Sequence, residues 1–185
     1  MKRIKTLSKV SLILLLGLVA INCKNKKSDD SSILALVAIS SGRSGDCQVT
    51  TSGKTTFTFV TDLTSTSTSS TGTISSIGTI PVVIHENAAL KIKVNSIGTA
   101  VKITGKAYGI VYESSSCPLT TASSIGSSYT LTGNYSDSNS EFTSSHKIDG
   151  TSTLTFTKTG TFYYFFYAIP SKGQSAKVTY TVTGS

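Results

Sequence analysis

The chain has 185 residues, no Trp and only 14% charged residues, and it is rich in Ser and Thr, a composition that favours strands and turns over helices. Its net charge of +8 does not indicate nucleic-acid binding, because the cations are not clustered on the main domain. Residues 1–22 carry four cations and no acid, whereas nine lysines face seven acids from Ser44 onward. We therefore expect a nearly neutral domain with no nucleic-acid partner.

Residues 1–22 have the pattern of a bacterial signal peptide. A short basic segment ends at Lys9, and residues 10–21 form an almost unbroken apolar run. This run is too short for a membrane-spanning helix, which needs about 20 apolar residues. Cys23 follows the run directly, after Ala20 and Asn22.

The junction at Cys23 resembles the lipobox of bacterial lipoprotein precursors. In that family the signal peptide is cut before the cysteine, and diacylglycerol is attached to its sulfur. The usual box has Leu three residues before the cysteine and Gly, Ala or Ser immediately before it, so Ala20 and Asn22 depart from it. The looser box of spirochaete lipoproteins tolerates such residues. The resemblance to leptospiral-type lipoproteins covers roughly the first 45 residues and implies a lipid on Cys23. The alternative is an ordinary cleaved signal peptide with an incidental cysteine.

Residues 23–44 form the predicted lipidated tether. Residues 24–32 are polar and charged, as in a flexible spacer, and residues 33–39 are a short apolar run. Seven apolar residues cannot cross a bilayer. We interpret the run as a short buried element of the domain; the alternative is a segment that dips into the membrane interface.

Residues 45–185 are predicted to form one all-β domain, a single antiparallel β-sandwich of immunoglobulin-like or jelly-roll-like type. Apolar and polar residues alternate with a period of two, as in half-solvated antiparallel strands. Glycines at eight positions are interpreted as turns between short strands. The stretch 159–163 and the expected last strand 176–183 are also similar to the ends of bacterial immunoglobulin-like and pre-peptidase C-terminal domains, which are β-sandwich modules with accessory binding roles. This resemblance supports the fold and says little about function. The alternating apolar residues are Phe57 and Phe59; Leu90, Ile92 and Val94; Val101 and Ile103; Leu154 and Phe156; and Val178, Tyr180 and Val182. The glycines are Gly53, Gly78, Gly98, Gly105, Gly133, Gly150, Gly160 and Gly173.

Three segments of low complexity, residues 64–76, 114–128 and 136–145, are predicted to be exposed loops. We interpret them as solvated connections in a Ser/Thr-rich secreted protein. The alternative is that they are recognition loops or sites of sugar attachment.

Two cysteines remain once Cys23 is acylated, and they predict one disulfide. An exported protein meets an oxidising compartment, so we expect Cys47 to pair with Cys117. The bond would tie the start of the domain to the loop that contains Cys117. The alternative is two free buried thiols.

The sequence offers no constellation that selects an enzymatic function. The chain has two histidines, His85 and His146, and neither has carboxylates or cysteines at metal-ligand spacing. No nucleophile elbow and no phosphate-binding loop occurs in the sequence. We therefore expect surface histidines, no metal, no cofactor and no enzymatic activity.

Six consecutive aromatic residues, 162–167, are the most unusual feature of the domain. On a strand they alternate between two faces, so both faces are aromatic. The interpretation that we favour is a central strand with both faces covered. The alternative is an exposed binding face made of Tyr163, Phe165 and Tyr167, with Lys172 on the adjoining loop.

Together these features predict a lipoprotein of the bacterial envelope, anchored to the outer membrane, that acts by binding. If it is displayed on the cell surface like an adhesin, the resemblance to spirochaete lipoproteins implies host extracellular or serum proteins as partners. A structural envelope protein without a soluble ligand is the second possibility. A small hydrolase or an accessory domain of one is the third and has the least support.

Overall fold

A computed structural model describes residues 45–64, 69–80 and 83–184, which form an almost entirely β domain. The predicted signal peptide, Cys23 and the tether lie outside the described residues. The one helical element in these ranges is a single 3-10 turn, η1 (Pro170–Lys172). The strands are β1 (Cys47–Thr51), β2 (Lys54–Thr58), β3 (Val60–Asp62), β4 (Ser70–Thr73), β5 (Gly78–Ile80), β6 (His85–Val94), β7 (Ala100–Glu113), β8 (Ala122–Ser123), β9 (Tyr129–Asp137), β10 (Ser145–Phe156), β11 (Gly160–Ala168) and β12 (Thr179–Thr183).

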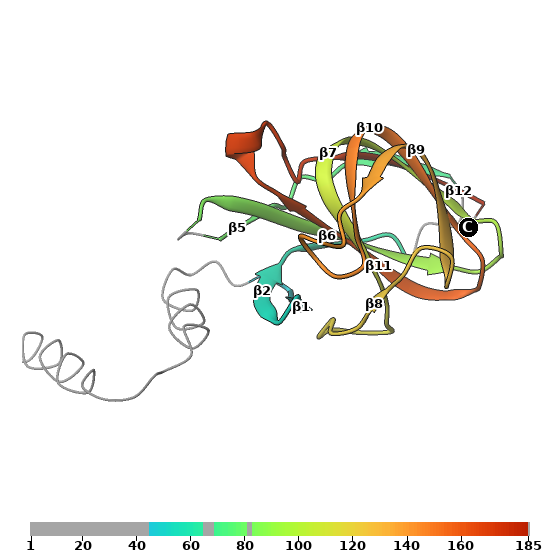
Figure 1. The fold of residues 1–185 in the computed structure, drawn as a ribbon. Coiled ribbons are helices and arrows are strands. Elements are labelled where there is room, and N and C mark those ends of the chain that lie inside the picture. The colour runs from blue at the N-terminus through green and yellow to red at the C-terminus, as the bar shows by residue number, and fades with distance from the viewer. Residues whose placement is uncertain (1–44, 65–68, 81–82, 185) are drawn as a thin grey trace, which may run out of the picture. The chain divides into compact units, whose positions relative to one another are not determined.

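The long strand β7 joins two layers of sheet (Figure 1). Along one edge, β12 pairs with residues 100–104 and β11 pairs with residues 108–113, while β10 follows the opposite edge. One layer is therefore β4–β12–β7–β10–β9. The other is β10–β7–β11–β6, with β3 and β5 on the free edge of β6. This arrangement confirms the predicted sandwich, in which β3 pairs with β6 in parallel.

The main core lies between the two layers and follows the alternation in the sequence. The apolar residues predicted to point inward on β6, β7, β10 and β12 are all buried. Phe162, Tyr164 and Phe166 of β11 enter the same core from the second layer. Burial of apolar area at roughly 25 cal/mol per Å² makes this core the main source of folding free energy.

Glycines in register lie where the sheet bends between its layers. Gly105 of β7 pairs with Gly150 of β10, and their φ angles are 159° and 127°. A Cβ on Gly105 would lie 2.8 Å from the Cγ1 atom of Val178. Gly133 also lies inside a strand, next to an irregularity in the pairing of β9 with β10. The prediction of turns at these three glycines is therefore wrong: they lie inside strands, where a missing side chain permits the bend.

The outer face of the first layer is covered with threonine, which accounts for part of the Ser/Thr content of the chain. Such a face is solvated on one side, as is common in antiparallel sheets. Hydroxyl groups on neighbouring strands bond to one another across it. These pairs are Thr71 with Thr181 at 3.1 Å, Thr73 with Thr179 at 3.3 Å, and Thr104 with Thr151 at 3.0 Å.

Strand β11 separates the main core from a second, smaller hydrophobic cluster. Tyr163 and Phe165 point into this second cluster, together with Ile110 and Tyr112 of β7. The β1–β2 hairpin covers it and forms a two-stranded sheet of its own. Both faces of the aromatic strand are therefore buried, as the interpretation of a central strand predicts.

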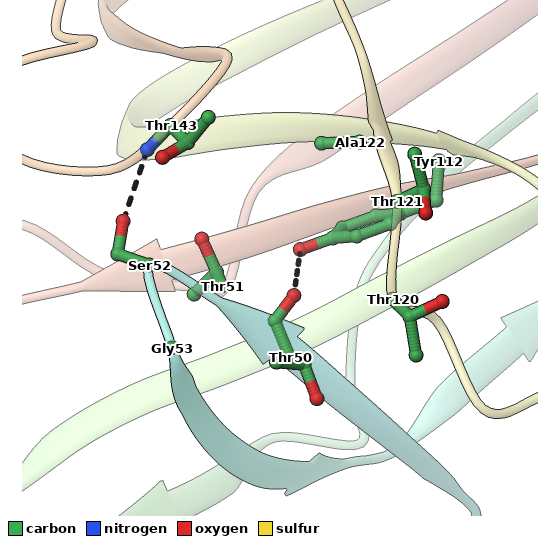
Figure 2. Close-up of a pocket in the computed structure, with 9 residues that line it drawn as sticks. All are labelled: Thr50, Thr51, Ser52, Gly53, Tyr112, Thr120, Thr121, Ala122 and Thr143. Atoms are coloured by element: carbon green, nitrogen blue, oxygen red, sulfur yellow. Dashed lines mark hydrogen bonds between the residues drawn. The ribbon is translucent and has the colours of Figure 1, made fainter.

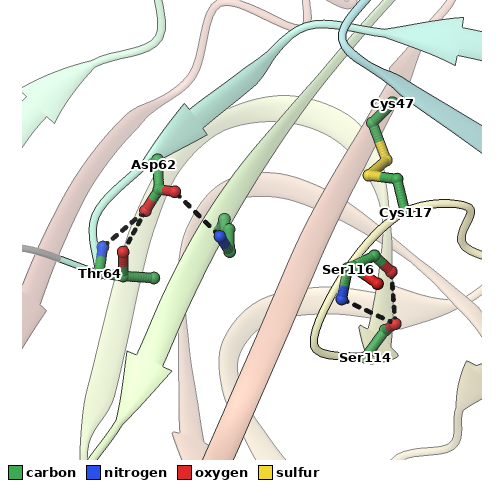
Figure 3. A network of polar contacts seen from close by, with 7 residues as sticks. Cys47, Asp62, Thr64, Ser114, Ser116 and Cys117 are labelled. Carbon is green, nitrogen blue, oxygen red and sulfur yellow. Dashed lines mark hydrogen bonds and ion pairs between the residues drawn. A yellow bond between two sulfur atoms is a disulfide. The ribbon is translucent and has the colours of Figure 1, made fainter.

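A disulfide between Cys47 and Cys117 holds the covering hairpin to the neighbouring loop (Figure 3). The two Cα atoms are 5.4 Å apart. Beyond the bond, the loop runs beside β1: Leu119 donates its N–H to the carbonyl of Gln48, and Thr50 donates to the carbonyl of Leu119, both at 2.8 Å. The predicted disulfide is confirmed.

Two other sequence predictions need correction. The alternation placed Phe57 and Phe59 inside, but both are only half-buried and Thr58 is fully buried. Thr58 pairs with Cys47 on the neighbouring strand. Because directly paired residues point to the same face of a sheet, the Thr58 side chain also points toward the second cluster.

The three segments of low complexity are also not purely solvated loops. They contain β4, β8 and the ends of β9 and β10, and buried residues such as Ile74 and Leu119.

We expect the double substitution Cys47→Ala and Cys117→Ala to lower the free energy of unfolding by about 4 kcal/mol. The bond joins residues with a sequence separation of 70, so its loss raises the conformational entropy of the unfolded chain and thereby stabilises the unfolded state. Denaturant unfolding with and without a reducing agent measures the effect. Reduction should weaken the wild type and the Cys23→Ser control equally and leave the double variant unchanged. A wild type that is indifferent to reduction would contradict the structural role of the bond.

Candidate functional site

The exposed aromatic face that the sequence offered as a binding site is mostly covered. Tyr163 is 3% exposed and Phe165 is fully buried. Burial raises the pKa of Tyr163, with the charge of Lys91 opposing the shift. The hypothesis of an accessible face is therefore wrong for these two residues, because the β1–β2 hairpin and the loop after Cys117 lie over them.

Tyr167 and Lys172, the other two predicted residues, lie at the end of the covered face and remain accessible, Tyr167 in part. Tyr167 and His85 form a hydrogen bond through the phenol oxygen and Nδ1. The ring of Phe142 packs on Tyr167 with centroids 4.9 Å apart, and on Tyr108 with centroids 5.3 Å apart. We call His85, Tyr108, Phe142 and Tyr167 the aromatic rim.

The electrostatics of the rim favour neutral groups. Burial lowers the pKa of His85, and the nearby positive charge of Lys172 lowers it further. Burial raises the pKa of Tyr108 and of Tyr167. The neutral form of His85 is therefore favoured, and the rim presents aromatic and hydroxyl groups between an exposed cation, Lys172, and an exposed carboxylate, Glu141, whose charge acts on Tyr108.

A pocket of about 290 Å³ lies between the turn of the β1–β2 hairpin and the loop before β8 (Figure 2). The phenol of Tyr112 lies in this pocket and donates a hydrogen bond to the carbonyl of Thr50 at 3.1 Å. Thr143 closes one side and donates its N–H to the Ser52 hydroxyl at 3.0 Å. The lining residues are Thr50, Thr51, Ser52, Gly53, Tyr112, Thr120, Thr121, Ala122 and Thr143.

Seven of the nine residues that line the pocket carry a hydroxyl group. Burial raises the pKa of Tyr112 to about 12, against a smaller opposing effect of the Thr51 hydroxyl. The Thr51 hydroxyl is itself buried and forms no well-aligned hydrogen bond among the described residues. A carboxylate, imidazole or amine is missing from this lining, so it provides donors and acceptors but no general acid or base at neutral pH. Such a site can hold a small neutral polar group.

The residues of this pocket could not be selected from the sequence. Ser and Thr occur throughout the chain, so Thr50 or Thr121 carries no distinguishing signal. The disulfide was the one usable indication, because it brings β1 and the loop after Cys117 together.

Other polar contacts at the surface hold loops in place. Asp62 accepts hydrogen bonds from the N–H and the hydroxyl of Thr64 and pairs with Lys91 at 3.0 Å (Figure 3). Desolvation raises the pKa of Asp62, but these hydrogen bonds outweigh it and hold the pKa below its usual range. The Ser114 hydroxyl bonds to the backbone of Ser116 next to the disulfide. These contacts fix the ends of β3 and the disulfide loop.

His146 was expected at the surface, and this prediction is wrong: the residue is fully buried in the domain. Its Nε2 atom lies 2.6 Å from the Tyr164 phenol, and its Nδ1 atom is buried without a partner in the described residues. Gly109 makes room for the pair, since a Cβ there would lie 2.6 Å from Nε2. A protonated imidazole would need a second acceptor and would be poorly solvated, so burial lowers the pKa of His146 to about 4.

In the part of the chain that the structure describes, no group of three His, Cys, Asp or Glu residues is placed to hold a metal ion. The same residues include no helix long and apolar enough to cross a membrane. Comparisons with models of known families, with curated proteins and with solved structures give no match for this chain.

We expect the domain to lose stability as the pH falls from 6.5 to 4, because His146 must take up a proton on unfolding. The folded-state pKa of about 4 lies below the ordinary value of 6.5. The neutral histidine therefore stabilises the fold fully above pH 6.5, and this contribution falls by about 2 kcal/mol by pH 5. Thermal unfolding across this range tests the prediction. His146→Gln should flatten the pH dependence, whereas the control His85→Gln should keep most of it. Equal profiles for both variants and the wild type would exclude His146 as the cause.

Proposed function

We propose that the protein is a lipid-anchored lipoprotein of the bacterial envelope that acts by binding rather than by catalysis. The observation that carries the proposal is the assignment of the three cysteines. Cys47 and Cys117 form a disulfide, as exported proteins do. Cys23 is outside this pair and stands directly after the apolar run, at the position that bacterial lipoproteins acylate.

A role in binding is supported by the site described above. The pocket at Tyr112 and the aromatic rim both lie beside the covering hairpin and offer hydroxyl and aromatic groups. Aromatic side chains, tyrosine above all, are effective in recognition because they bury a large area while few rotatable bonds are fixed. If the domain is displayed outward, host extracellular or serum proteins are the partners that the resemblance to spirochaete lipoproteins implies.

We expect mass spectrometry of the protein from its native membrane to find Cys23 as the first residue, with diacylglycerol on its sulfur and a further acyl chain such as palmitate on its amine. The Cys23→Ser variant should leave the membrane fraction, because one domain without its acyl chains has no comparable hydrophobic anchor. The Cys47→Ala and Cys117→Ala variant is the matched control and should stay in the membrane fraction. An unacylated Cys23 in the native protein would overturn the proposal.

Surface display separates binding of host proteins from a purely structural role in the envelope. Protease treatment of intact cells should remove an outward-facing domain, whereas a periplasmic domain is cut only after lysis. Immobilised matrix and serum proteins then test binding directly with the acylated protein. Retention by none of them would favour the structural alternative.

A further inference from the structure

The segments that form the pocket at Tyr112 are bonded to one another (Figure 2). The Tyr112 phenol of β7 donates to the carbonyl of Thr50 on the hairpin. The N–H of Thr143, in the loop between β9 and β10, donates to the Ser52 hydroxyl at the turn of the same hairpin. The disulfide joins the hairpin to the loop before β8. The pocket is therefore preorganised, and a ligand would bind without the cost of ordering its walls.

The hydroxyl groups of the pocket retain hydrogen-bonding capacity of both kinds. The Tyr112 phenol donates its proton to the backbone, so its oxygen can still accept a hydrogen bond. The Ser52 hydroxyl accepts one from Thr143 and keeps its own O–H as a donor. The Thr51 hydroxyl is buried and forms no well-aligned hydrogen bond among the described residues. Such an atom is unfavourable in free energy unless water or a ligand supplies a partner.

These groups fit a neutral ligand with several hydroxyl groups better than an ion or an apolar side chain. A carboxylate only accepts hydrogen bonds and an ammonium only donates them, so either would leave part of the lining unused. The nine described lining residues also include no charged side chain to balance such an ion. An apolar side chain would remove the hydroxyl groups from water without replacing their hydrogen bonds. A sugar ring carries neighbouring hydroxyl groups that both donate and accept.

The volume of the pocket suits one sugar ring. About 290 Å³ lies at the lower end of the range for small-molecule sites, roughly 300–1,000 Å³. The same space would hold roughly ten waters at about 30 Å³ each, far more than the single partner that Thr51 needs. Glycoside hydrolysis uses a pair of carboxyl groups beside the bond that is cleaved, and the described lining has none. A sugar held here would be bound and released unchanged.

We propose that the pocket at Tyr112 binds a neutral sugar ring, a terminal hexose or N-acetylhexosamine of a glycan. The inference deepens the proposed binding function and rests on it. The Tyr112 phenol and the Thr51 hydroxyl form the buried part of the site, and the exposed residues Ser52 and Thr121 lie at its opening. Host glycoproteins and the polysaccharides of the bacterial envelope both present such rings.

The experiment measures sugar binding by the acylated full-length protein in micelles of a zwitterionic detergent that has no sugar headgroup. The neutral probes are the methyl glycosides of glucose, galactose, mannose and N-acetylglucosamine, and methyl glucuronide is the charged counterpart of the first. We expect saturation-transfer NMR to show contact with a neutral probe, and titration to give a dissociation constant of about 1 mM. Methyl glucuronide should bind more weakly than methyl glucoside, because the lining offers no cation to its carboxylate.

Thr51→Val and Tyr112→Phe each remove one hydroxyl group and keep the shape of the side chain. Each should weaken binding of the best neutral probe about tenfold, as expected for one hydrogen bond lost in a buried site. Thr51→Val should not lower the midpoint of denaturant unfolding, because the hydroxyl that it removes has no well-aligned partner in the described residues. Thr104→Val, on the outer face of the first layer, is the matched control and should change binding by less than about twofold.

Two further arms identify the source of the ring. Immobilised host glycoproteins are tested before and after enzymatic removal of their glycans, and the purified polysaccharide of the bacterial outer membrane is tested beside them. Retention that is lost on deglycosylation supports a host glycan, and retention by the bacterial polysaccharide supports one of the envelope. Retention by neither would contradict a glycan as the ligand.

The outcomes separate this inference from the proposed function. Contact with none of the four neutral probes would overturn the sugar site and leave the lipid anchor and the tests with host proteins standing. Binding that both pocket variants retain would overturn it as well, because the ring would then lie elsewhere, and so would tighter binding of methyl glucuronide. An unacylated Cys23 in the native protein would instead overturn the lipoprotein proposal and leave the sugar titration as measured.

Discussion

Six aromatic side chains in succession impose the main constraint on this domain. A strand places them alternately on its two faces, and exposing either aromatic face to water would be unfavourable in free energy. The sandwich core covers Phe162, Tyr164 and Phe166, as the inner face of a central strand would be covered in any sandwich. The opposite face needs a separate cover, which the β1–β2 hairpin and the loop held by the Cys47–Cys117 disulfide provide. The second cluster exists because of the aromatic strand.

This cover determines where a binding function can lie. It removes the centre of the aromatic face, at Tyr163 and Phe165, from solvent. At the same time, its own edges create the pocket at Tyr112 and leave Tyr167 accessible beside the end of η1. The pocket at Tyr112 and the aromatic rim therefore both lie at the edges of this cover.

The sequence predicted those features that depend on local periodicity. The alternation at Leu90–Ile92–Val94 and at Val101–Ile103 identified strands and their buried faces, and the even pair of cysteines identified the disulfide. Features that depend on non-local packing could not be predicted. Thr58 is buried because of its cross-strand partner, and His146 because Gly109 leaves space beside Tyr164. The pocket is formed by hydroxyl residues that look like any other Ser or Thr in the chain.

The burial of both faces of β11 is tested most directly by the stability of Tyr163→Ala. Tyr135, on the edge strand β9, is 39% exposed, and Tyr135→Ala is therefore the matched control. Removal of a large aromatic ring from a covered cluster should lower the free energy of unfolding by about 3 kcal/mol, whereas the control should lose less than about 1 kcal/mol. Chemical denaturation of the oxidised proteins measures both. A Tyr163→Ala domain as stable as the wild type would mean that this face is open to solvent, and the account of the covering hairpin would be wrong.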